Sequence, residues 1–125
     1  MYRIVNTTRQ TVLASRAERA RSYWARLRGL MFRQSLPHDG GLVIEPNNSV
    51  HTFWMRFPID VVFVDRQDRV VGLVEAMPPN RPFAGARRAR RTIELPSGTI
   101  ARTQTEQGDT LVIEATSEAD AVTPT

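Results

Sequence analysis

The sequence predicts a mainly β protein: a β-barrel or jelly-roll-like sandwich with one N-terminal α-helix packed on it. An α+β fold is the alternative. Three observations support this fold class. Seven or eight short β-like runs are separated by turn residues, a single helical pattern is present, and residues 59–64 form an apolar run typical of a strand buried on both faces. We expect residues 1–115 to form one domain and residues 116–125 to form a disordered acidic tail.

The N-terminal third predicts a hairpin followed by a helix. Two β-like runs within residues 2–14 flank a polar turn. Ser15, with Glu18 three residues later, matches a capping box and predicts a helix over 16–28 that ends at Gly29. A stripe of apolar residues at spacings of three and four supports this helix: Ala17, Ala20, Trp24, Leu27 and Met31.

The remaining residues predict strands joined by turns. Residues 42–44 predict a short strand, and Pro58 predicts a bend because proline cannot donate to a strand ladder. Residues 59–76 are typical of a β-hairpin with a turn after Asp65. Residues 92–102 predict a strand, a turn and a second strand, and residues 111–115 predict the last strand.

Composition excludes several classes of site and indicates a cytoplasmic protein. The chain of 125 residues has no cysteine and only two histidines, which excludes disulfides, thiolate metal sites and histidine-rich metal sites. We therefore expect no metal and no cofactor. No apolar run approaches the roughly 20 residues of a membrane span, and the first residues lack the apolar segment of a signal peptide.

The net charge of +4 is unevenly distributed, and every basic residue is an arginine. Residues 1–35 carry eight arginines and one acid, whereas residues 105–125 carry five acids and no base. The arginine bias is typical of a GC-rich genome; selection for bidentate contacts with anions is the alternative.

Four segments together resemble the domain of unknown function 192 family, a small β-rich domain. They are Arg28-Gly-Leu-Met-Phe-Arg, Gly41-Leu-Val-Ile, the segment His51–Asp65, and Ile93-Glu-Leu-Pro-Ser-Gly with the later Gly108-Asp109. The resemblance covers about residues 2–115. It implies a mainly β, barrel-like or jelly-roll-like fold with a helix, and it implies no reaction, cofactor or catalytic residue.

The segment from residue 51 to residue 60 is the best candidate for a site, because it mixes polar side chains with large apolar ones. We expect a non-catalytic domain that binds a small anionic or sugar-like molecule in a cleft, since arginine forks suit carboxylates and phosphates. The candidate ligand-binding residues are Arg28, Asn47, His51, Thr52, Trp54, Arg56 and Asp60.

Three alternatives stay open. A hydrolase of unknown substrate would use His51 and Asp60 as an acid–base pair. Otherwise His51 caps the end of a strand, and Asp60 satisfies backbone donors or an arginine where the chain bends at Pro58. The second alternative is a glycosidase-like or metal-carboxylate site that uses a pair of acids. Its mid-chain candidates are Glu45, Asp60, Asp65, Asp68 and Glu94. Nucleic-acid binding, which we do not expect to be the main role, would use the arginine-rich segment 81–91. Its candidate residues are Arg81, Arg87, Arg88, Arg90 and Arg91.

Overall fold

A computed structural model describes residues 1–116, and these residues form a mainly β domain. Seven strands form a mixed sheet in the order β6-β5-β8-β3-β2-β1-β9, and β4 and β7 form a small second sheet. The strands are β1 Tyr2–Asn6, β2 Thr11–Ala20, β3 Gly40–Ile44, β4 Ser49–Val50, β5 Ile59–Val64, β6 Val70–Met77, β7 Ala84–Gly85, β8 Arg91–Pro96 and β9 Leu111–Ala115. The helices are α1 Tyr23–Arg28 and α2 Thr99–Thr103.

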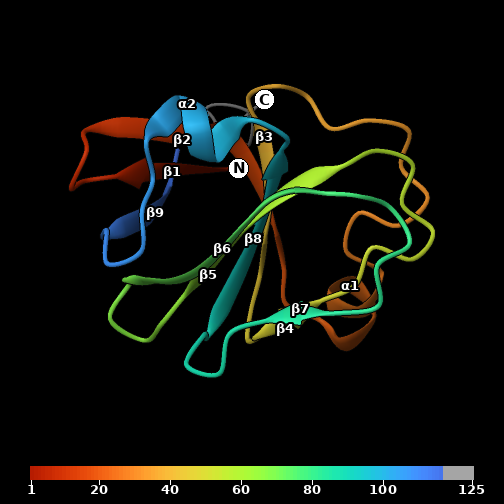
Figure 1. Cartoon of the computed structure of the whole chain (residues 1–125). Coiled ribbons are helices and arrows are strands. Elements are labelled where there is room, and N and C mark those ends of the chain that lie inside the picture. Colours follow the sequence, from red (N-terminus) through yellow and green to blue (C-terminus); the bar gives the residue numbers. More distant parts are fainter. Residues whose placement is uncertain (117–125) are drawn as a thin grey trace, which may run out of the picture.

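The large sheet curls into a half-barrel (Figure 1). Its two edges approach each other where an isolated antiparallel bridge joins Arg69, just before β6, to Thr110, just before β9. The predicted mainly β class is confirmed. Within this class the sheet is a half-barrel, and a few backbone hydrogen bonds link its edge strands. The single predicted helix is replaced by two short ones.

Both faces of the large sheet are buried at its central strands, and β5 shows this most clearly. All six of its residues are buried, as the apolar run 59–64 predicts. Val62 and Val64 join a core that includes Ile100 of α2, whereas Val61 and Phe63 join a second core on the opposite face. Leu30, which follows α1, packs in that second core. In Figure 1, α2 and α1 accordingly lie on opposite sides of the central strands.

The predicted helix over 16–28 is wrong in its first half. Residues through Ala20 continue β2, which pairs antiparallel with β1 and parallel with β3. Pairing with β3 along residues 16–20 keeps this segment extended and overrides its helical pattern. The helix begins only after Ser22, whose hydroxyl oxygen accepts the N–H of Ala25 at 3.1 Å. Gly29 caps its end, as predicted.

The predicted second strand within residues 92–102 is also wrong, because α2 occupies this position. Buried Asp60 holds the helix in place. Its carboxylate accepts the N–H of Ile100 at 2.8 Å, and its other oxygen accepts the N–H of Ala76 at 2.8 Å. Both oxygens of Asp60 therefore satisfy backbone donors. The contact with Ile100 joins residues far apart in the sequence, so the strand-like pattern of residues 92–102 does not reveal it.

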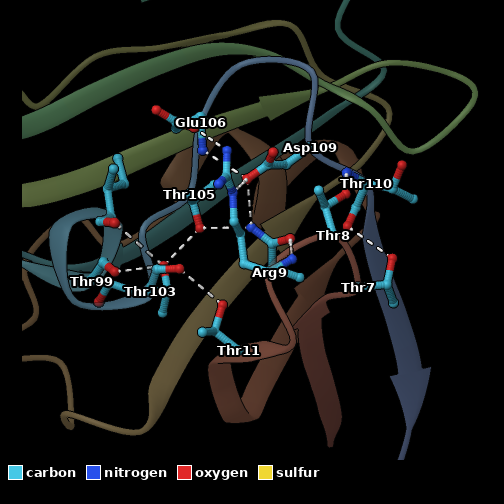
Figure 2. Close-up of polar contacts among 12 residues, drawn as sticks. Thr7, Thr8, Arg9, Thr11, Thr99, Thr103, Thr105, Glu106, Asp109 and Thr110 are labelled. Carbon is cyan, nitrogen blue, oxygen red and sulfur yellow. Dashed lines mark hydrogen bonds and ion pairs between the residues drawn. The ribbon is translucent and has the colours of Figure 1, made fainter.

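A buried polar network joins the β1–β2 turn to the loop between α2 and β9 (Figure 2). Asp109 lies at its centre and accepts hydrogen bonds from Asn6 at 2.9 Å and from Arg9 at 3.1 Å. Asn6 also donates to Thr105 at 3.2 Å. Burial raises the pKa of Asp109, but the hydrogen bonds outweigh burial and hold this pKa below its ordinary value. The network therefore stabilises the closing edge of the half-barrel.

Two predictions concern the chain ends and membrane spans. Thr116, the first residue of the predicted disordered tail, donates its N–H to the carbonyl of Met1 at 3.2 Å. The rest of that tail, 117–125, lies outside the described residues. Within the described part, neither helix has the length and apolar character that crossing a membrane requires.

Candidate ligand-binding site

A cavity of about 310 Å³ opens beside the second core, between the end of α1 and the loops that surround β4 and β7. Its wall is mostly apolar, with a few polar side chains, as in small-molecule sites. Leu30, Ile44, Val50 and Met55 are its buried apolar residues. Leu27 and Phe83 are strongly exposed and also line it, which leaves an apolar rim open to solvent.

Glu94 is the acid of this cavity. Its strand, β8, lies between β3 and β5, so that Glu94 is opposite Leu42 and Val61 and only 2% exposed. The carboxyl accepts the backbone N–H of Leu30, and its Oε1 has no hydrogen-bond partner among the described residues. Burial raises the pKa of Glu94 to about 7, although the charge of Arg33 opposes this shift.

Arginines supply the opposite charge. Arg26 and Arg28, on α1, both line the cavity. Arg26 donates through Nη1 to the carbonyl of Pro46 at 3.0 Å, but its buried Nε has no partner among the described residues. One orphan donor and one orphan acceptor thus belong to side chains of the same cavity. Because buried polar groups are normally paired, this arrangement suits a ligand that carries both kinds of group.

Three of the predicted site residues line the cavity: Arg28, Asn47 and His51. Asn47 donates to Thr92 at 3.1 Å, which fixes the side chain against β8. The Nδ1 of His51 accepts the N–H of Phe53 at 3.1 Å. The neutral imidazole therefore carries its proton on Nε2, where it is a donor.

The other predicted site residues do not line the cavity. Thr52 is buried and joins two loops, since its hydroxyl donates to the carbonyl of Pro78 at 2.6 Å and accepts the N–H of Arg81 at 2.7 Å. Trp54 is 62% exposed and stacks on Phe32, with ring centroids 6.2 Å apart. Arg56 is exposed.

His51 and Asp60 do not form an acid–base pair. Asp60 alternates with Ile59 and Val61 along β5 and lies on the opposite face, where both of its oxygens accept backbone N–H groups. Within residues 1–116, His51 makes no hydrogen bond with a serine or threonine hydroxyl. The geometry thus assembles none of the contacts that the hydrolase alternative requires.

The predicted nucleic-acid residues are divided between different environments. Arg81, Arg87 and Arg88 are exposed. Arg91 forms ion pairs with Asp68 and with Glu45, and it lines a second cleft together with Arg90. Of the five predicted arginines, Arg91 alone forms an ion pair with another residue from 1 to 116.

Carboxylates and histidines are scattered in the structure. Among residues 1–116, no group of three or more acids or histidines is placed where it could hold a metal ion.

The sequence alone indicates Glu94 only as one of several acids for a carboxylate pair. Its signal was its place in a strand between Ile93 and Leu95, but recognising it as a cavity residue required knowing that both faces of β8 are buried.

Comparisons with known proteins agree with this fold. The family model DUF192, described as an uncharacterized ACR, matches residues 4–113. A UPF0127 protein of Thermococcus sibiricus is 31% identical over 123 residues, which are 95% of this chain and 79% of that protein.

Two solved structures are similar in fold. A protein of unknown function from Novosphingobium aromaticivorans has a TM-score of 0.77 at 24% identity, with 89% of this chain and 82% of that one covered. A "putative transcription regulator" from Sinorhizobium meliloti has a TM-score of 0.77 at 20% identity, with 89% and 90% covered. With the family match spanning nearly the whole chain, these likenesses lead to one assignment: the chain belongs to the domain of unknown function 192 family.

Proposed function

We propose that the protein is a non-catalytic domain that binds a small sugar acid, or a similar hydroxylated acid, in the cavity at Glu94. The observation that carries this proposal is the pair of orphan buried atoms, Glu94 Oε1 and Arg26 Nε, on two side chains that line one cavity. A sugar acid carries hydroxyl donors for the glutamate and a carboxylate for an arginine. The apolar wall suits the carbon skeleton of such a ring.

The arginines that line the cavity favour a ligand with an acid group. Arg28 lines the cavity and forms no ion pair with any residue from 1 to 116, so its guanidinium is available to a carboxylate. Glu94 lies at the buried end, against Leu30 and Gly29. We infer that the acid group of the ligand faces Arg28 and that a ligand hydroxyl reaches Glu94.

Calorimetric titration with D-glucuronate, D-glucose and propionate tests this proposal. We expect glucuronate to bind more tightly than either glucose, which lacks the carboxylate, or propionate, which lacks the ring. Arg28→Ala should weaken glucuronate binding at least tenfold, because a hydrogen bond to a charged group contributes about 1.5–3 kcal/mol. The same variant should leave any binding of glucose unchanged.

Arg56→Ala is the matched control, since Arg56 is also an exposed arginine but does not line the cavity. It should bind glucuronate as the unmodified chain does. Equal weakening by Arg28→Ala and Arg56→Ala would mean that net charge, and not the cavity, attracts the ligand. Failure of all three compounds to bind at millimolar concentration would contradict the proposed ligand class.

A further inference from the structure

A second cleft, of about 420 Å³, is lined almost entirely by charged side chains. Its lining residues are Arg21, Glu45, Pro46, Arg66, Arg90 and Arg91. They come from four places in the chain: the ends of β2 and β3, the β5–β6 turn and the start of β8. Because β2 and β3 run parallel and β8 antiparallel to β3, these segments meet at the same end of the large sheet.

Hydrogen bonds fix the segments that carry these arginines. The backbone N–H of Arg90 donates to the carbonyl of Val64 at 2.7 Å, and the carbonyl of Arg90 accepts the N–H of Asn47 at 2.9 Å. The chain before β8 is thereby held against the end of β5 and against the loop after β3. These backbone hydrogen bonds hold the part of the cleft that carries Arg90 in a fixed position relative to the large sheet.

The charges around the cleft do not balance. Glu45 forms ion pairs with Arg19 at 2.5 Å, Arg21 at 3.1 Å and Arg91 at 3.5 Å. Asp68 forms an ion pair with Arg91 as well. Arg66 and Arg90 have no ion pair with any residue from 1 to 116. Four arginines and one acid line the cleft, which leaves an excess of three positive charges.

An oxyanion would offset this excess. A phosphate monoester brings a charge of about −1.5 to −2 at neutral pH together with three acceptor oxygens, and guanidinium groups match its geometry bidentately. The negative charge of Glu45 does not oppose such a ligand, because three arginines already neutralise it. We propose that this cleft binds a small molecule through its phosphate or diphosphate group. The proposal is independent of the function proposed for the cavity at Glu94.

Titration of the whole chain with pyrophosphate at low ionic strength tests the proposal. We expect saturable binding with a stoichiometry of one. The double variant Arg66→Ala/Arg90→Ala should weaken binding at least tenfold, because it removes the two arginines of the cleft that have no acid partner. Both side chains are exposed, so we expect the variant to unfold at nearly the same temperature as the unmodified chain.

The double variant Arg87→Ala/Arg88→Ala is the matched control. It removes the same charge from the neighbouring exposed segment without touching the cleft, and it should change pyrophosphate affinity less than twofold. Equal weakening by the two double variants would overturn the proposal, because binding would then follow net charge alone. Absence of pyrophosphate binding at millimolar concentration would also overturn it.

A single-stranded 12-nucleotide DNA distinguishes a small ligand from a polynucleotide. We expect the DNA to bind more weakly than pyrophosphate and to be displaced by it. DNA that binds more tightly, resists displacement and is lost with Arg87→Ala/Arg88→Ala would overturn the small-molecule proposal in favour of nucleic acid.

Discussion

Glu94 is the residue on which the candidate site depends. It is the only acid within residues 1–116 that is almost fully buried and has an oxygen without a hydrogen-bond partner. A carboxyl group with a pKa of about 7 changes its charge within the physiological range. In its ionised form it would accept a hydrogen bond from a hydroxyl of the proposed ligand, and in its neutral form it could also donate one. The charge and the hydrogen bonding of the Glu94 carboxyl group in the candidate site therefore depend on pH.

The free energy of unfolding should depend on Glu94 in a predictable direction. Its pKa is about 7 in the folded chain and about 4.5 in the unfolded chain, so the folded state binds more protons between these values. The contribution of Glu94 to the free energy of unfolding is therefore fully present below pH 4.5 and is lost as the pH rises through about 7. The loss amounts to about 3 kcal/mol.

Urea unfolding of the unmodified chain and of Glu94→Gln from pH 5 to pH 8 measures this effect. Glutamine cannot ionise, so the variant should lose much less stability over this range. Glu114→Gln, an exposed residue of β9, serves as the control and should follow the unmodified chain. Parallel curves for the unmodified chain and Glu94→Gln would show that the Glu94 carboxyl titrates normally.

At the scale of the element, the end of α1 shapes the buried end of the cavity. Gly29 has a φ of +51°, and a Cβ at this position would lie 3.1 Å from Glu94 Oε1. The glycine therefore serves two purposes: it permits the turn that ends α1, and it leaves room for the carboxyl group. The segment Arg28-Gly-Leu-Met is thus part of the site as well as a helix cap.

Gly29→Ala should destabilise the fold by about 1–2 kcal/mol through backbone strain. It should also weaken glucuronate binding, because the added methyl group crowds Glu94. Gly98→Ala is the matched control, since its φ is +96° but nothing lies within 4 Å of an added Cβ. We expect it to lower the melting temperature without changing ligand affinity. Unchanged affinity in Gly29→Ala would separate this glycine from the site.

Elements whose partners are local were predicted correctly, and elements fixed by distant partners were not. The strand at 59–64 and the hairpin at 59–76 follow from apolar runs and turn residues. Residues 16–20 have a helical pattern, but β3 pairs with them and keeps them extended. Residues 99–103 resemble a strand, but the Asp60 carboxylate caps them as a helix.

The candidate site was predicted in part for the same reason. Arg28, Asn47 and His51 lie near apolar segments that reach the cavity, and they line it. Thr52 and Asp60 are polar residues of the same stretch, but they satisfy backbone groups elsewhere. Which face of a strand a residue occupies, and whether that face is covered, are properties of the whole sheet. These two properties cannot be predicted from a single sequence.

At the scale of the whole molecule, polar contacts hold one edge of the half-barrel sheet and the loops beside it. The Asp109 network bridges the β1–β2 turn and the loop before β9, and the Arg69–Thr110 bridge lies beside it. Arg33, in the loop after α1, forms an ion pair with Glu18 of β2 at 2.8 Å. The hydrogen bond from Arg33 lowers the pKa of Glu18. Ionised acids thus help to hold the curled sheet together.

Acid should open this arrangement. The lowered pKa of Asp109 means that its contribution to stability is present above an unfolded value of about 3.8 and is lost as the pH falls through its folded value. Together with Glu94, this predicts maximal stability near pH 4–5. Melting temperatures from pH 2 to pH 8 measure the profile.

Asp109→Asn should lower the melting temperature at neutral pH and make it less dependent on pH below 4. A profile in which Asp109→Asn loses stability in acid as steeply as the unmodified chain would show that the network does not couple to protons.

The most direct test of the proposed ligand site is a chemical-shift titration of the ¹⁵N-labelled chain with D-glucuronate. We expect the largest shifts at the backbone amides of Gly29, Leu30, His51 and Glu94, which surround the cavity. They should saturate together, and Glu94→Gln should reduce them. Shifts confined to residues around Arg66 and Arg90, or no saturable shifts at all, would contradict the account.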